Sequence, residues 1–97
     1  MYKATKEQID AWKQKYENVY RVEVGDKACY LHSPDRKTMS YASSIGQKDP
    51  MKFNEIILNN CWLAGDEEIK TKDSYFMGVS AKLADIIEVA EAKLEKL

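Results

Sequence analysis

Cys29 and His32 are the residues whose types and spacing most suggest metal binding. They form a Cys-x-x-His pair, and thiolate and imidazole groups are the ligands that zinc prefers. A complete site would need two more ligands, for which Cys61 and an acidic side chain are the candidates. However, the alternating pattern around the pair is typical of a β-strand, where positions three apart face opposite sides of the sheet. We therefore predict no metal site and two reduced, structural thiols.

The other patterns that could carry catalysis are incomplete. A Cys nucleophile with His32 as its base would need the same convergence, an orienting group and an oxyanion hole. The acidic run Asp66-Glu67-Glu68 lacks the alternating oxygen ligands of a calcium loop, and a solvated loop is the simpler interpretation. The glycines form neither a dinucleotide-binding nor a phosphate-binding motif. We expect no catalytic residue, no cofactor and no enzymatic activity.

Aromatic residues among basic ones are the remaining candidate for binding chemistry. Tyr16, Tyr20, Tyr30 and Tyr41 lie in the first half of the chain, whose charges sum to +2 against −3 for the second half. Tyrosines flanked by Lys and Arg can stack single-stranded bases. The whole chain nevertheless carries a net charge of only −1, and Tyr20 and Tyr30 could simply be cross-strand partners. Nucleic-acid binding through the basic, Tyr-bearing half is thus the alternative function and not the first choice.

The length and composition predict a single globular domain, residues 1–97. The chain is 44% hydrophobic and 32% charged, which is unlike a disordered segment. Two cysteines are too few for a disulfide-stapled secreted scaffold. No apolar run approaches the roughly 18 residues that a membrane span requires. We expect a soluble cytoplasmic protein.

The elements in the first third of the chain have local start and stop signals. Thr5 and Gln8 form a capping box before a helix over residues 6–17. The period then changes to two, which predicts a strand from residue 18 to 24. Gly25 before Asp26 is typical of a type II′ turn, and the chain returns in a second strand over residues 27–32. These strands form an antiparallel β-hairpin.

Helices dominate the rest of the chain. Ser33-Pro34-Asp35 predicts a helix start with Ser33 as N-cap, and Gly46 ends that helix. Asp49-Pro50 begins a third helix, whose apolar run predicts a buried, central position. Residues 67–71 around Ile69 could form a short third strand. Asp73 caps a last helix over about residues 74–95, predicted to be the longest element. The fold class is α+β, with an N-terminal helix, a hairpin and three helices.

The apolar stripe of the last helix extends further than so small a domain can cover. It reaches Leu94 and Leu97, and an apolar helix face without a partner is typical of a surface that binds another protein. We therefore assign Ile87, Leu94 and Leu97 as candidate partner-binding residues. Burial of the stripe in the core is the simpler interpretation, and partner binding by its overhanging end is the alternative that these residues would carry.

A family resemblance covers about residues 50–95. It rests on the apolar segment 53–62 (FNEIILNNCW), the acidic Gly65-Asp66-Glu67 and the segment 73–76 (DSYF) that opens the last helix. This arrangement resembles small tail assembly chaperones of tailed bacteriophages and prophages. The resemblance implies a non-enzymatic protein of a bacterial host's cytoplasm that keeps the aggregation-prone tape measure protein soluble through apolar helix surface. A minor virion component would be consistent with the same resemblance.

Overall fold

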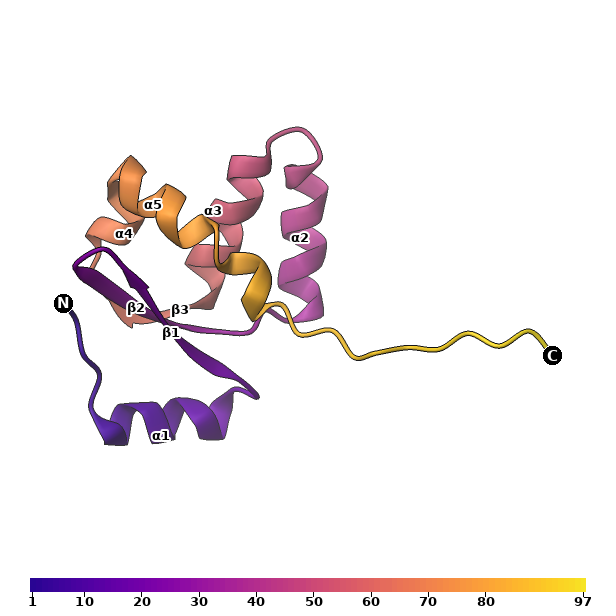
Figure 1. Ribbon diagram of the computed structural model, residues 1–97, viewed down its shortest axis with the longest axis horizontal. Helices are drawn as coiled ribbons and strands as arrows, with labels where there is room; N and C mark the ends of the chain where they lie inside the picture. Colours follow the sequence, from indigo (N-terminus) through magenta and orange to yellow (C-terminus); the bar gives the residue numbers. More distant parts are fainter.

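The computed structural model describes residues 1–97. It confirms the α+β class, with a three-stranded antiparallel sheet and helices on both of its faces (Figure 1). The elements in chain order are α1 (Lys6–Lys15), β1 (Val19–Val24), β2 (Lys27–His32), α2 (Arg36–Gly46), α3 (Pro50–Cys61), β3 (Trp62–Gly65), α4 (Glu68–Thr71), α5 (Asp73–Ser80) and the 3₁₀ turn η1 (Leu83–Ile86).

The N-terminal helix and the hairpin form as their local signals predict. The capping box of α1 is present, with the Gln8 N–H donating to the Thr5 hydroxyl oxygen at 3.2 Å. Val24 pairs with Lys27 across the two-residue turn. Gly25 has φ +59° and no non-glycine residue has positive φ, which is the type II′ requirement for a glycine at the first central position. The turn thereby fixes the register of the whole hairpin.

The third strand lies elsewhere than predicted. Residues 68–71 form the short helix α4, whereas β3 follows α3 without a loop and pairs antiparallel with β2. Gly65 makes this close pairing feasible, because a Cβ there would lie 2.6 Å from the Cα of Cys29. The sheet order is β1-β2-β3, so β2 is the central strand.

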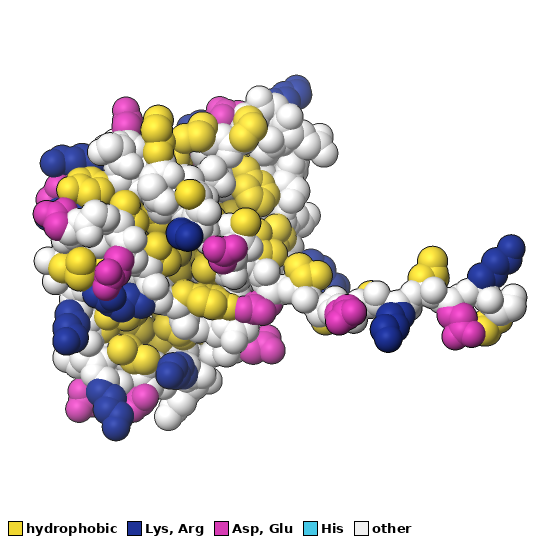
Figure 2. All heavy atoms as spheres, in the orientation of Figure 1, with side chains coloured by type: hydrophobic (Ala, Val, Ile, Leu, Met, Phe, Trp, Pro, Cys, Tyr) yellow, Lys and Arg dark blue, Asp and Glu magenta, His cyan; other side chains and the backbone are white.

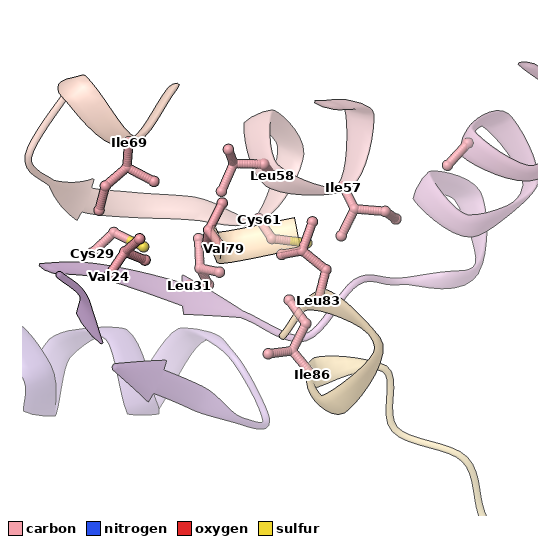
Figure 3. Packing of buried hydrophobic residues seen from close by; sticks show 11 residues of the cluster. Val24, Cys29, Leu31, Ile57, Leu58, Cys61, Ile69, Val79, Leu83 and Ile86 are labelled. Carbon is pink, nitrogen blue, oxygen red and sulfur yellow. The ribbon is translucent and has the colours of Figure 1, made fainter. Parts of the chain in front are cut away.

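The hydrophobic core lies between one face of the sheet and the helices of the second half (Figure 3). Cys29 and Leu31 of β2 are fully buried there, as are Ile57 of α3 and Val79 of α5. α3 buries Ile57, Leu58 and Cys61 in this core, whereas its other residues are half-buried or exposed, so the prediction of a buried, central third helix holds for one face only. The other face of the sheet is covered by α1 and by the N-terminal segment before it, whose Tyr2 ring packs on Tyr30 (Figure 1).

The second helix begins two residues later than its sequence signal suggested. Asp35, not Ser33, is the N-cap, and its carboxylate accepts a hydrogen bond from the Thr38 N–H at 2.7 Å. A carboxylate at this position also favours the positive end of the helix dipole. Pro34 consequently precedes the helix instead of opening it.

The prediction of a long C-terminal helix over 74–95 is wrong. The chain is helical only at Asp73–Ser80 and then in the turn Leu83–Ile86, and residues 87–97 run away from the domain without regular structure (Figure 1). The helix stops where the core stops: Ile86 is 2% exposed, whereas Val89 is 82% exposed. A short isolated helix is marginal in water, because most helical stability comes from packing an apolar face.

Candidate functional site

The predicted partner-binding residues all fall in residues 87–97, called here the C-terminal segment. Ile87 is half-buried where the segment leaves η1, whereas Leu94 and Leu97 are fully exposed. The structure therefore does not bring these three side chains together into one surface. It leaves two large apolar side chains in water with nothing packed on them.

The spacing of apolar residues in this segment fits a helical face that is not formed in the isolated chain. Ile87, Ala90, Leu94 and Leu97 recur at intervals of three and four, which would place them within one stripe of an α-helix. Val89 would lie outside this stripe, about 80° around the helix from Leu97. A partner that offers an apolar groove would supply the packing that the segment lacks.

The start of the segment is held beside the sheet. The Ile87 N–H donates to the Ala84 carbonyl oxygen at 3.3 Å, and the Tyr20 hydroxyl of β1 donates to the Glu88 carboxylate. From Val89 onward every residue is exposed. The C-terminal segment is therefore held to the domain at Ile87 and Glu88, whereas its remaining residues make no contact that buries them.

The residues of the considered zinc site point apart. Cys29 lies in the core between the sheet and the helices (Figure 3), whereas His32 stacks on Tyr16, the C-cap of α1, with ring centroids 3.9 Å apart. The prediction that they face opposite sides of the sheet is confirmed. No group of three or more His, Cys, Asp or Glu residues is placed to hold a metal ion.

Both thiols are buried and without a disulfide. Burial raises the pKa of the Cys29 thiol to about 12 and that of the Cys61 thiol to about 11. A thiol needs its anionic form to act as a nucleophile or a metal ligand. At neutral pH these two groups serve as small apolar side chains.

Asp66 of the acidic run makes structural hydrogen bonds. Its carboxylate accepts from the backbone N–H of Tyr2 at 2.8 Å and from that of Ala28 at 2.9 Å, and these bonds lower the pKa of Asp66. Glu67 and Glu68 form ion pairs with lysines of the same short stretch of helix. The run is therefore not a site with free converging carboxylates.

The tyrosines of the basic half do not form a common platform. Tyr20 pairs with Leu31, and Tyr30 pairs with Arg21, so the two rings lie on opposite faces of the sheet and the prediction of a cross-strand tyrosine pair is wrong. Tyr30 is buried, and its hydroxyl accepts from the Ala4 N–H at 3.2 Å. Tyr41 is exposed, but it lies on α2, apart from the other three tyrosines.

A cleft that the sequence did not indicate lies beside β1. It has a volume of about 250 Å³ and is lined by residues 20–23 of β1 and by Lys82, Asp85 and Ile86. The cleft forms only because η1 lies beside β1 in the fold, so that residues some 60 positions apart line it together. The hairpin pattern identified the strand but gave no reason to single out Arg21 and Glu23.

In comparisons with known proteins, no family model, curated protein or solved structure matches the chain. None of its helices is long and apolar enough to cross a membrane.

Proposed function

We propose that this chain is a non-enzymatic protein-binding domain whose C-terminal segment folds into an amphipathic helix on its partner. The observation that carries the proposal is the full exposure of Leu94 and Leu97 in a segment whose apolar residues have helical spacing. Coupled folding places such residues in a groove at the moment of binding and uses part of the interaction energy to order the segment.

The partner that we propose is the one implied by the resemblance of residues 50–95 to phage tail assembly chaperones. We propose that the chain acts in the bacterial cytoplasm and holds a tape measure protein soluble during tail assembly. The expected contact is with apolar stripes on helical segments of that protein, which an apolar helix can cover with anchors at i, i+3, i+4 and i+7. The buried, high-pKa thiols and the structural role of Asp66 are compatible with a protein that performs no chemistry.

Co-expression with a tape measure protein encoded beside this gene tests the proposal. Wild-type protein should keep the partner in the soluble fraction, whereas Leu94→Asp with Leu97→Asp should not. Both residues are fully exposed, so the double variant should remain folded.

A matched control uses apolar residues of the same segment that would lie off the proposed face. Val89→Asp with Ala92→Asp introduces the same charge and also lowers helix propensity, yet this variant should still solubilise the partner. If both double variants behave like wild type, the segment is not the contact. If wild type leaves the tape measure protein insoluble, the chaperone function is wrong.

The nucleic-acid alternative has less support. Tyr16, Tyr20 and Tyr30 are engaged in contacts within the domain, so base stacking would have to disrupt them. Oligonucleotide binding with a steep decrease in affinity as salt rises would favour this alternative.

A further inference from the structure

The outer edge of β1 is an unpaired strand edge. β1 pairs with β2 alone, and the other side of the strand borders the cleft described above. The strand reads Val-Tyr-Arg-Val-Glu-Val over residues 19–24, a β-branched and aromatic sequence that favours pairing. Such an edge is a template for another strand unless charges or a covering element prevent it.

The backbone groups that face this edge can be identified from the hydrogen bonds around the hairpin. The Ser33 N–H donates to the Asn18 carbonyl at 3.2 Å, and hydrogen-bonded pairs alternate along an antiparallel ladder. Even-numbered residues of β1 therefore bond to β2. Val19, Arg21 and Glu23 direct their N–H and C=O groups outward.

An independent contact supports this alternation. Ala28, which is opposite Glu23, sends its N–H to the Asp66 carboxylate and receives the Asp66 N–H on its carbonyl at 3.0 Å. Both groups of Ala28 thus point away from β1. Glu23 must then point its own backbone groups to the free side.

We propose that a second copy of this chain pairs antiparallel with this edge, with Val22 opposite Val22 at a two-fold axis, so that the two sheets become one six-stranded sheet. This arrangement places Arg21 of each copy opposite Glu23 of the other. Both residues have outward backbone groups, so each such pair is hydrogen-bonded, as the antiparallel ladder requires. The proposal does not depend on the proposed tail function.

Charge complementarity favours this register over those in which the two-fold axis is shifted by one residue. Arg21 and Glu23 lie on the same face of β1 and form an ion pair within one chain, and their side chains are 36% and 54% exposed. With Val22 at the axis, the four charges of the dimer form a square in which every neighbour has opposite sign. A shift that centres the axis on either charged residue places two like charges directly opposite each other, which destabilises a strand pair.

The rim of the cleft is also compatible with a two-fold contact. Lys82 and Asp85 of opposite sign line it beside the strand, and an isologous interface requires a surface that complements itself. Figure 2 shows that side chains of both signs lie among hydrophobic atoms on one face of the molecule.

Charge reversal tests the proposal by sedimentation velocity over a wide range of protein concentration. Wild type should dimerise as concentration rises. Arg21→Glu alone places four carboxylates around the axis, and Glu23→Arg alone places four cations there, so each variant should dimerise roughly tenfold more weakly or worse. The double variant, Arg21→Glu with Glu23→Arg, restores the alternating square and should dimerise like wild type.

Mixing the two single variants separates the contact between copies from the ion pair within each chain. Each single variant has lost its internal pair, yet one copy of each has complementary charges across the axis. The mixture should form a heterodimer at wild-type strength. If the mixture stays monomeric while both variants are folded by circular dichroism, the proposed register is wrong.

Cross-linking gives a second measurement that does not rely on charge. Directly opposed residues in a non-hydrogen-bonded pair have Cα atoms about 4.5 Å apart, which is within disulfide range. Val22→Cys should therefore form a disulfide dimer with a mild copper–phenanthroline oxidant. Tyr20→Cys is the control, because residues 20 of the two copies would be too far apart.

The native thiols should not interfere with this cross-link, since both are buried. A monomeric Val22→Cys protein under oxidant, or a Tyr20→Cys protein that cross-links equally well, would overturn the proposal.

Discussion

The Asp66 carboxylate connects the N-terminal segment to the central strand, through hydrogen bonds from Tyr2 and Ala28. These bonds favour the charged form and lower the pKa of Asp66 from its ordinary value of 3.8. A carboxylate with a lowered pKa in the folded state stabilises the fold above its unfolded pKa, and that contribution is lost as pH falls through the folded pKa.

We predict that Asp66→Ala lowers the free energy of unfolding at pH 7 and that its difference from wild type shrinks below about pH 4. Urea unfolding across this pH range measures both. Glu67→Ala is the control, because Glu67 makes a surface ion pair with Lys70 at 3.7 Å and should change stability little at any pH. A difference between Asp66→Ala and wild type that is constant down to the acid limit would contradict this assignment.

The two thiols should be inert in the folded protein. Burial raises the pKa of Cys29 and Cys61 well above neutrality, so a thiol reagent at pH 8 should modify them only as fast as the domain opens. Modification should be immediate in concentrated urea.

Protein purified without chelator should contain no stoichiometric zinc. One equivalent of zinc that is lost in Cys29→Ser would show that a metal site exists.

At the scale of elements, the sequence best predicts the helices and strands whose ends are set by nearby capping, glycine or proline residues. The capping box at Thr5 and the glycine turn at Gly25 fix α1 and the hairpin from neighbouring residues alone. The Asp49-Pro50 start does the same for α3. Each of these signals acts within a few residues, so no knowledge of the fold is needed to interpret it.

Elements that depend on distant partners could not be predicted in this way. β3 begins at Trp62 directly after α3, without a glycine or proline to mark the change, and it is a strand because β2 offers an edge there. The stripe that ends at Leu94 has helical spacing in the sequence, but a helix would need a surface to pack on. Sequence reasoning therefore found the exposed residues of the candidate site but assigned them the wrong conformation.

Ile57 tests the role of α3 as the central helix. It is fully buried in the core shared with β2 and η1, so Ile57→Ala should lower the free energy of unfolding by about 2–5 kcal/mol. Met51→Ala on the same helix is the control, since Met51 is 43% exposed and its truncation should cost about 0.5 kcal/mol or less. Equal effects of the two substitutions in urea unfolding would show that α3 is peripheral.

The whole molecule is larger than a compact chain of its length. Its radius of gyration is 14.8 Å and its longest extent is 54 Å, whereas a compact domain of this size is expected to have a radius of gyration of about 12.5 Å. The difference is explained by the C-terminal segment, which extends away from the core (Figure 1). The folded domain therefore ends, in energetic terms, near Glu88.

Removing residues 89–97 should leave the domain intact. None of these residues is buried, so the free energy of unfolding should change by less than about 0.5 kcal/mol, while small-angle X-ray scattering should show a smaller radius of gyration. A marked loss of stability on truncation would mean that the segment packs on the domain in solution.

α1 is attached to the sheet by few contacts and should detach from it before the core unfolds. The helix contributes no fully buried side chain and rests on the sheet through rings, Trp12 against Tyr30 at 5.5 Å and Tyr16 on His32. Its backbone amides should accordingly exchange with deuterium through a local opening that leaves β2 and α3 closed. Heat or mild denaturant would then remove α1 first and uncover the aromatic face of the sheet while the remaining core persists.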